Sequence, residues 1–522
     1  WRSWRLLSNA QCEYVLCLYS QKGCDKNLKN GIKLTDLYLK HDGLIVRSDT
    51  KVTAEVLAAT SSLRVVGRAG TGVDNIDLQA ATRKGVVVLN TPGGNSISAC
   101  ELTCALITSL ARNVAQAAQS MKEGRWDRKL YSGFELSGKT LAVLGLGRIG
   151  REVALRMQSY GMKVVGFDPM TSVEAAKEFG VDKLELEQIW PIADYITVHT
   201  PLIPQTRNLI NATSLAKSKK GVRVINVARG GIVDEEALLE SLKAGHCGGA
   251  GLDVFAEEPP KNPITLELIK HPKVIATPHL GASTAEAQQR VAVEIAEQFL
   301  ALSGKSTAFA VTGIVNAPVL VAALSDVNAP WINLAKKLGQ LGGKFLKGNE
   351  GINIESQTVG NEMEKKKFVH TAVLVGILAG QTKNGLNLIN APILAKDIGI
   401  SITESHTDGE NAVVVKVGQH KVKVSNFCKI IQPFFGLFFA GTVRGANEPL
   451  LVSIDDAVFP NGVVLGENLS LYRGNGPNSL SNIVAALSTK GVQIQSLNTA
   501  GEWFAVQTNQ ELMVPVEGIE SF

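Results

Sequence analysis

The feature that most constrains the fold is a glycine-rich segment at residues 145–150, which reads GLGRIG. An apolar run, LAVL at residues 141–144, leads directly into it, and a stretch with helical spacing of apolar residues follows. The G-x-G-x-x-G spacing predicts a tight turn from a buried strand into a helix, because the first glycine permits the turn and the third lets helix and strand pack closely. The backbone N–H groups at such a helix N-terminus are free to bind an anion.

A second apolar run, VVGF at residues 164–167, ends in Asp168, which follows Gly150 by 18 residues. In dinucleotide-binding units the second glycine lets the backbone approach a pyrophosphate, and a carboxylate about 20 residues further on binds the ribose hydroxyls. A carboxylate there also repels a 2′-phosphate, which favours NAD over NADP. The sequence therefore predicts an NAD site; the alternative is a tight strand–helix turn that binds no ligand.

Short apolar runs alternate with helical patterns from about residue 13 to residue 300, as is typical of a parallel sheet with crossover helices. Because the glycine motif lies in mid-chain, a separate α/β domain is expected to precede it. Two long helical patterns, at residues 96–124 and 285–303, are predicted to cross between the two domains. The chain near residue 300 then completes the first domain.

We predict an α/β protein with a Rossmann-type doubly wound parallel sheet at residues 95–286. A discontinuous flavodoxin-like domain is assigned to residues 1–94 and 287–308. Past residue 305, glycine-broken segments and strand pairs predict smaller α+β C-terminal domains. The first is assigned to residues 309–450 and the second, which contains a β-α-β-β pattern, to residues 451–522.

The composition indicates a chain without a nucleic-acid or membrane partner. The net charge is +5 over 522 residues, and no apolar run is long enough to span a bilayer. The seven cysteines are odd in number and have unrelated spacings, which fits a reducing compartment, so we expect a cytoplasmic location. Cys100 and Cys104 are interpreted as small core residues rather than a metal or redox site, and no metal site is predicted.

Four polar residues follow apolar runs of the predicted parallel sheet. Arg229 lies in NVARGG, Asp253 follows the run that ends at residue 252, Glu258 lies in AEEPP and His279 lies in TPHLG. Ligands of open parallel sheets bind outside the carboxyl ends of the strands. These residues are therefore candidates for one site.

Their chemistry suits hydride transfer at an alcohol carbon beside a nicotinamide ring. Arg229 can hold an α-carboxylate through two hydrogen bonds, His279 can take the hydroxyl proton, and Glu258 can stabilise the resulting imidazolium. Each also has another explanation: Arg229 could pair with Asp234, His279 could cap a turn, and Glu258 could be a solvated loop acid.

Two segments of the first domain carry an arginine beside small or hydroxyl residues. Arg47 and Ser48 end the run LIV at residues 44–46, and GRAGTGVD at residues 67–74 is a second glycine-rich loop. No helix and acid follow that loop in register, so both segments are interpreted as anion-binding loops. Asn95 lies near the predicted hinge, where it could cap the following helix or contact substrate.

A series of motifs between about residues 43 and 318 resembles the D-isomer-specific 2-hydroxyacid dehydrogenases, most closely the long animal-type members that act on 3-phosphoglycerate. The motifs are GLIVRSDTKVT, VVGRAGTGVDNID, NTPGGNS, GLGRIGREVA, VHTPLIPQT, NVARGGIVDE, DVFAEEPP, PHLGAST and GIVNAP. The resemblance implies that the flavodoxin-like domain binds substrate and that the Rossmann-type domain binds NAD. It further implies an intervening domain and, at the C-terminus, an ACT-like regulatory domain.

The resemblance also implies roles for individual residues. In the family the arginine of ARGG, a glutamate before proline and the histidine of PHLG are catalytic, which places these roles on Arg229, Glu258 and His279. The implied substrate contacts are Arg47, Ser48, Gly72 and Asn95, with Arg128 able to reach the substrate of a neighbouring subunit. The implied cofactor contacts are Thr71, Gly145, Gly147, Arg148, Ile149, Gly150, Asp168, Thr200, Val227, Ala228, Arg229, Asp253, His279, Leu280, Gly281 and Ala282.

The chain departs from the family pattern in several places, among them Gly93, where animal relatives have an asparagine, and a short tail to Phe522. Residues 1–40 match poorly, so the first unit of the substrate domain is abbreviated. Val227 stands where animal relatives have a cysteine, and it is expected to contribute its backbone. Arg473 stands where serine-inhibited bacterial relatives have a histidine, which argues against serine feedback at that position.

Three functions remain open on the sequence. The first is NAD-dependent oxidation of 3-phosphoglycerate to 3-phosphohydroxypyruvate, the first step toward serine. The second keeps the scaffold but acts on hydroxypyruvate or glyoxylate. The third is a non-enzymatic dinucleotide-sensing scaffold, which would keep the same three residues. The arginine-bearing loops and the C-terminal domains favour the first.

Self-association is also predicted, because long crossing helices with apolar faces can form a two-fold contact. The sequence does not distinguish a homodimer from a homotetramer.

Overall fold

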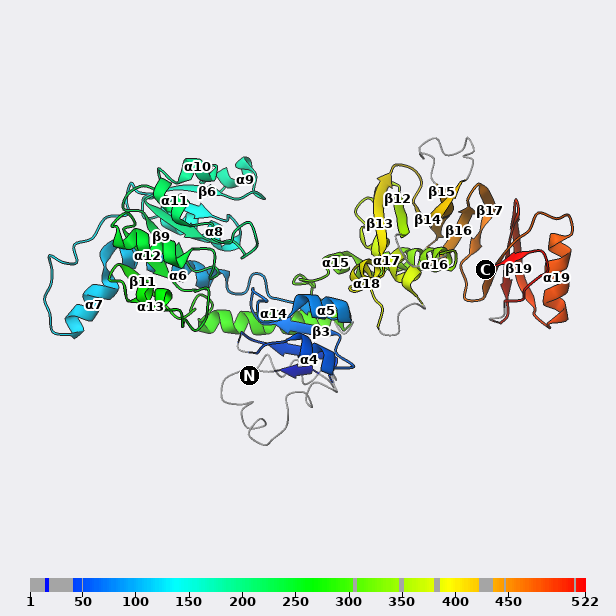
Figure 1. Ribbon diagram of the computed structural model, residues 1–522, viewed down its shortest axis with the longest axis horizontal. Coiled ribbons are helices and arrows are strands. Elements are labelled where there is room, and N and C mark those ends of the chain that lie inside the picture. Colours follow the sequence, from blue (N-terminus) through cyan, green and yellow to red (C-terminus); the bar gives the residue numbers. More distant parts are fainter. Residues whose placement is uncertain are drawn as a thin grey trace, which may run out of the picture. The chain divides into compact units, whose positions relative to one another are not determined.

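The structure is a computed structural model that describes residues 15–17, 41–48, 50–303, 308–346, 352–379, 385–421, 435–445, 447–510 and 513–522 (Figure 1). The chain divides into two compact units. One consists of Ala69–Thr71 and Thr91–Ala296, and the other consists of Trp1–Arg68, Gly72–Asn90 and Glu297–Phe522. The poorly matching N-terminal residues 1–14 and 18–40 lie outside the described residues.

A four-stranded parallel sheet in the order β1-β2-β3-β4 opens the second of these units. Its core includes Leu44, Val66 and Val88 from neighbouring strands. Phe299, near the end of the crossing helix α14, approaches Gly43 of β2 closely, so the chain returns to this sheet. The elements are β1 (Val15–Cys17), β2 (Gly43–Val46), α4 (Ala54–Ala59), β3 (Val65–Arg68), α5 (Leu78–Lys84), β4 (Val87–Leu89) and α14 (Ala285–Leu302).

A seven-stranded parallel sheet forms the other unit, with strand order β11-β10-β9-β8-β5-β6-β7. Successive residues of one strand enter two separate cores, because Leu141 and Val143 face one side of the sheet while Ala142 and Leu144 face the other. Strands buried on both faces read as continuous apolar runs. The strands are β5 (Thr140–Leu144), β6 (Lys163–Phe167), β7 (Asp182–Lys183), β8 (Tyr195–Val198), β9 (Arg223–Asn226), β10 (Gly249–Leu252) and β11 (Val274–Ala276).

The sheet order reverses between β5 and β8, which is the doubly wound arrangement predicted from the sequence. This confirms the predicted fold class for the NAD-binding part of the chain. The helices around the sheet are α6 (Ser96–Arg112), α8 (Arg148–Gln158), α9 (Val173–Lys177), α10 (Leu186–Ile189), α11 (Ala212–Lys217), α12 (Glu235–Lys243) and α13 (Pro263–Lys270).

The long helix predicted at residues 96–124 is two helices, and that prediction was wrong. Helix α6 ends at Arg112. The next residue, Asn113, has a φ of 51° in the left-handed region, and α7 (Val114–Lys122) begins directly after it. Asparagine tolerates this conformation better than most residues with a side chain. The polarity pattern continues across the break, so it does not show in the sequence.

A six-stranded mixed sheet follows, in the order β13-β12-β14-β15-β16-β17. Helices α16 and α17 pack closely, because a Cβ at Gly339 would lie 2.2 Å from the Val373 carbonyl oxygen and one at Gly376 would lie 2.0 Å from that of Lys336. The elements are α15 (Val319–Ala323), α16 (Ala329–Lys344), β12 (Ile352–Val359), α17 (Phe368–Leu378), α18 (Ala391–Asp397), β13 (Ile400–Thr407), β14 (Ala412–Lys421), β15 (Phe435–Arg444), β16 (Glu448–Ile454) and β17 (Ala457–Val464).

The last sheet has the strand order β19-β20-β18-β21. Helix α19 lies between β18 and β19 in the sequence. The sequence-based boundary at residues 450–451 falls inside β16, which pairs with β15, and β17 pairs in turn with β16 at the edge of the six-stranded sheet. The small C-terminal unit therefore starts near β18. Its elements are β18 (Leu469–Arg473), α19 (Ser479–Thr489), β19 (Ile494–Ala500), β20 (Trp503–Thr508) and β21 (Glu520–Ser521).

Arg473, at the end of β18, forms an ion pair with Glu502 inside the same small sheet. Over the described ranges, no helix has both the length and the apolar character needed to cross a membrane.

Candidate active site

The glycine loop after β5 has the backbone geometry that the motif predicts. Gly145 has a φ of 101°, and a Cβ at Gly150 would lie 2.0 Å from the Gly145 carbonyl oxygen, so neither position accepts a larger residue without distortion. A Cβ at Gly147, in contrast, would meet nothing within 4 Å. Gly147 is the N-cap of α8 and contributes no side-chain cap, which leaves helix N–H groups facing an open space.

Asp168 stands at the end of β6, beside this loop. Its Oδ2 accepts a hydrogen bond from Leu146 N at 2.8 Å, and its Oδ1 accepts one from Met170 N at 2.8 Å. Each oxygen retains a lone pair for a further donor. The carboxylate therefore both orders the loop and remains chemically able to bind ribose hydroxyls.

His199 and Thr200 directly follow β8, the strand that pairs with β5, and lie at the same edge of the sheet. The Thr200 Oγ1 atom is buried and has no hydrogen-bond partner within the described residues. A ligand bound at this edge of the sheet would supply that partner. Burial lowers the pKa of His199 to about 3, so this imidazole is neutral near pH 7 and bonds Thr197 Oγ1 at 3.0 Å through Nε2. The residues present thus fit a dinucleotide.

Arg229 follows β9 and is held by a short turn. Asn226 binds both sides of that turn, because its Nδ2 donates to Arg229 O at 2.9 Å and its Oδ1 accepts from Ala228 N at 3.0 Å. The Arg229 guanidinium donates to Ala228 O at 2.7 Å. Asp234, the alternative partner considered above, accepts from Ala237 N at 3.1 Å and caps α12.

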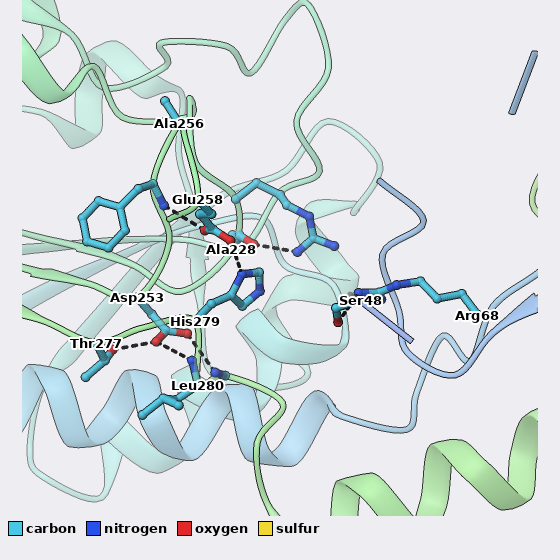
Figure 2. Close-up of polar contacts among 12 residues, drawn as sticks. Ser48, Arg68, Ala228, Asp253, Ala256, Glu258, Thr277, His279 and Leu280 are labelled. Atoms are coloured by element: carbon cyan, nitrogen blue, oxygen red, sulfur yellow. Dashed lines mark hydrogen bonds and ion pairs between the residues drawn. The ribbon is translucent and has the colours of Figure 1, made fainter. Parts of the chain in front are cut away.

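Glu258 and His279 form the central pair of the site. The Nδ1 atom of His279 lies 2.7 Å from Glu258 Oε2, and Glu258 Oε1 accepts from Phe255 N at 3.0 Å (Figure 2). Burial alone would raise the pKa of Glu258, but the hydrogen bonds from His279 and Phe255 and the charge of Arg229 outweigh it and lower that pKa below its ordinary value. Glu258 is therefore ionised at neutral pH and can stabilise a protonated imidazole.

The histidine belongs to a turn organised by Asp253. His279 has a φ of 54°, in the left-handed region, and its side chain is 48% exposed. Asp253 is fully buried and binds the backbone on the far side of the histidine, at Leu280 and Gly281. Asp253 was predicted to contact the cofactor; in this structure its carboxylate is directed into the turn.

The other predicted cofactor residues lie where the motifs place them. They occupy the carboxyl ends of β5, β9 and β11 or the first turn of α8. Exposed or half-buried positions among them are Arg148, Ile149, Ala228, Leu280 and Ala282, and buried ones are Val227 and Gly281.

Thr71 and Asn95 lie on the two segments that connect the compact units. Asn95 precedes α6 but makes no side-chain cap; its Oδ1 accepts from Thr71 Oγ1 at 2.5 Å. Thr71 Oγ1 also lies 3.2 Å from Thr91 O. The capping alternative for Asn95 is therefore wrong, and the side chain instead joins the two connecting segments.

Arg47, Ser48 and Gly72 belong to the unit with the four-stranded sheet, where a further cation joins them. Arg68, at the end of β3, donates through Nη2 to Ser48 Oγ at 3.0 Å (Figure 2). Asn75 Nδ2 donates to Arg47 O at 2.9 Å and fixes that loop. Arg68 is not among the substrate contacts predicted from the sequence. It follows an apolar run, as Arg47 does, and this pattern could have identified it. Arg128 is exposed on the segment after α7.

Comparison with known proteins identifies the family. A model of the D-isomer specific 2-hydroxyacid dehydrogenase NAD binding domain matches residues 104–281, and a model of the D-3-phosphoglycerate dehydrogenase intervening domain matches residues 327–455. The D-3-phosphoglycerate dehydrogenase of Rattus norvegicus is 49% identical over 468 residues, which cover 88% of this chain and 84% of the relative. The enzyme of that name from Methanocaldococcus jannaschii is 38% identical over 494 residues, which cover 92% of this chain and 89% of the relative.

Solved structures agree over the part of the chain that they cover. The TT0316 protein of Thermus thermophilus has a TM-score of 0.50 at 33% identity and covers 58% of this chain and 99% of its own. A glyoxylate reductase from Paecilomyes thermophila has a TM-score of 0.51 at 27% identity. The match covers 60% of this chain and 94% of the reductase. The chain belongs to the D-isomer specific 2-hydroxyacid dehydrogenase family and carries its NAD-binding domain.

Proposed function

We propose that this chain catalyses the NAD-dependent oxidation of 3-phospho-D-glycerate to 3-phosphohydroxypyruvate, the first step toward L-serine. The observation that carries this proposal is the 2.7 Å pair of His279 Nδ1 and Glu258 Oε2, in a unit that also holds Arg229 and the glycine loop. The intervening domain and the names of the relatives support the phosphorylated substrate.

The roles of the three side chains follow from their chemistry. NAD, when bound, supplies the acceptor for the hydride that leaves the carbon bearing the hydroxyl group. Arg229 holds the α-carboxylate of the substrate, and His279 takes the hydroxyl proton through Nε2, because Nδ1 faces Glu258. Glu258, ionised at neutral pH, balances the charge that the imidazole gains.

The predicted cofactor residues are proposed to hold NAD at the edge of the seven-stranded sheet. The N-terminus of α8 binds the pyrophosphate and Asp168 binds the adenosine ribose. Thr200 Oγ1 gains the partner that it lacks among the described side chains and backbone atoms.

Arg47, Ser48 and Arg68 are proposed to bind the substrate phosphate. Arginine suits this role because its planar guanidinium matches phosphate oxygens in pairs. Gly72 and Asn95 are proposed as further substrate contacts, and Arg128 as a contact to the substrate of a neighbouring subunit.

A homodimer or homotetramer is proposed, in the cytoplasm. Several large apolar side chains on α7 and the segment after it are exposed, including Trp126 at 73%, Leu130 at 70% and Phe134 at 55%. Exposed apolar side chains that gather on one segment are typical of a protein–protein contact.

The test is NADH formation from 3-phosphoglycerate and NAD, with D-glycerate and with NADP as controls. We expect a kcat/KM for 3-phosphoglycerate at least tenfold above that for D-glycerate, and at least tenfold above that measured with NADP. Equal activity with both acids would favour a hydroxypyruvate or glyoxylate reductase. NAD binding without turnover of any 2-hydroxyacid would favour a dinucleotide-sensing scaffold.

A further inference from the structure

The turn that carries His279 needs support from outside itself. The φ of His279 is 54°, which is sterically unfavourable for a residue with a Cβ, and the surrounding hydrogen bonds must stabilise this backbone conformation. The His279 N–H donates to Asp253 O at 2.8 Å and approaches Thr277 O at 3.0 Å. These bonds fix the backbone of the histidine but do not set the residues that follow it.

The carboxylate of Asp253 supplies the remaining support. Its Oδ1 accepts from Leu280 N at 2.7 Å, and its Oδ2 accepts from Gly281 N at 2.8 Å (Figure 2). A Cβ at Gly281 would come within 3.3 Å of Oδ2, so glycine allows this close approach. The fully buried carboxylate thus holds the chain on the C-terminal side of His279.

Thr277 holds the same carboxylate from the N-terminal side of His279. Its Oγ1 donates to Asp253 Oδ1 at 2.6 Å, and its backbone N–H donates to Leu252 O at 2.9 Å. The threonine is therefore anchored to the end of β10, and its hydroxyl is one of three donors that fix the rotation of the carboxylate. Without that hydroxyl, Oδ1 would keep only the bond from Leu280.

We propose that Thr277 is a positioning residue for the reaction, acting through Asp253 on the imidazole of His279. This inference rests on the proposed function. The hydroxyl orients the carboxylate, the carboxylate sets the backbone at Leu280 and Gly281, and that backbone aims the His279 ring at Glu258. Thr277 has no part in holding the substrate carboxylate, so its loss affects turnover rather than the binding of 3-phosphoglycerate.

The experiment compares Thr277→Val, Thr277→Ser and Thr277→Cys in the full-length chain. Valine keeps the shape but removes the donor, serine keeps the donor, and cysteine keeps a weak one. Thr103→Val is the matched control, because Thr103 is fully buried in the same unit and donates to Ala99 O at 2.8 Å inside α6. Steady-state kinetics with 3-phosphoglycerate are combined with amide hydrogen exchange of Leu280 and Gly281.

We expect Thr277→Val to lower kcat about tenfold, because a hydrogen bond to a charged group is lost, while the KM for 3-phosphoglycerate changes less than twofold. Thr277→Ser keeps at least half of kcat, Thr277→Cys lies between the two, and the Thr103→Val control stays within twofold of the parent. The Leu280 and Gly281 amides exchange faster in Thr277→Val than in the parent.

Unchanged kcat and unchanged exchange in Thr277→Val would overturn the inference. Equal loss in the serine and valine variants would also overturn it, because shape and not the hydroxyl would then matter. If Thr277→Val does not fold, kcat of Thr277→Ser is compared with kcat of Thr277→Cys. A lower kcat in the cysteine variant supports the inference, and equal values overturn it. A parent without NADH formation refutes the proposed function instead, and the exchange measurement still judges the turn.

Discussion

Two histidines in two sheets of this chain show how the fold decides what a side chain can do. His279 follows β11 of the parallel sheet; its side chain is 48% exposed and it pairs with the carboxylate of Glu258. His370 lies on α17 over the mixed sheet and is 5% exposed; its Nδ1 bonds Ser356 Oγ at 2.8 Å. Burial lowers the pKa of His370, so this imidazole favours its neutral form.

The difference follows from strand direction. All strands of the parallel sheet end at one edge, so the loops that carry Arg229, Glu258 and His279 leave from that edge and can bind one ligand. In the mixed sheet most neighbours are antiparallel, and polar residues such as Ser356 lie in mid-strand under a helix. There a histidine satisfies hydrogen bonds of the core and supports the fold.

The largest effect is expected at His279. Replacing it in His279→Asn removes the group that takes the hydroxyl proton, and kcat should fall about 10³-fold. Steady-state kinetics with 3-phosphoglycerate measure this. His370→Asn is the matched histidine variant and should keep kcat within twofold while lowering the melting temperature. A similar loss of kcat in both variants would break the distinction between the two sheets.

The next effect concerns Arg229. Arg229→Lys keeps the charge but loses the planar pair of donors, so kcat/KM for the 2-hydroxyacid should fall about 100-fold. The affinity for NADH, measured by fluorescence titration, should fall far less than kcat/KM, because Arg229 is only one of many proposed cofactor contacts. A kcat/KM within a few-fold of the parent would show that a single point charge is enough at this strand end.

Glu258→Gln should lower kcat about 30-fold, because the imidazole then gains its proton beside a neutral group. The pKa of Glu258 is lowered, so the carboxylate is already ionised well below neutral pH. Steady-state kinetics with 3-phosphoglycerate near pH 8, where Glu258 of the parent is ionised, measure this effect. A kcat within a few-fold of the parent would show that the carboxylate is not needed to balance the charge of the imidazole.

The smallest effect is on stability and involves His199. Its pKa is about 3 in the folded chain against an ordinary value of 6.5, so between these values the unfolded chain binds the extra proton. The free energy of unfolding should therefore decrease as pH falls below 6.5, by about 2 kcal/mol at pH 5. Denaturant titration of the parent and of His199→Gln measures it. The variant should lack this part of the pH dependence, and an equal dependence in both would contradict the assignment.

The sequence predicted the parts of the molecule that depend on local spacing. The glycine loop, the acid at Asp168 and the strand ends that carry Arg229 and His279 are all set within a few residues of their neighbours. For that reason the doubly wound sheet and its NAD-binding role could be predicted before the strand order was known.

What the sequence did not predict depends on contacts between distant segments. The pairing of β16 with β15 and of β17 with β16 moves a domain boundary, and Asn95 bonds Thr71 from another connecting segment. The role of Thr277 depends on the buried carboxylate of Asp253, which is 24 positions away in the chain. The break at Asn113 was missed for a different reason, since one left-handed residue leaves the helical pattern on both sides intact.

The central claim is that Arg229, Glu258 and His279 support direct hydride transfer from the hydroxyl-bearing carbon of a phosphorylated 2-hydroxyacid to NAD. The most direct test uses 3-phosphoglycerate deuterated at that carbon, with mass spectrometry of the reduced cofactor. The account predicts that each reduced cofactor carries one deuterium from the substrate. Reduced cofactor without deuterium, or no reduced cofactor at all, would contradict it.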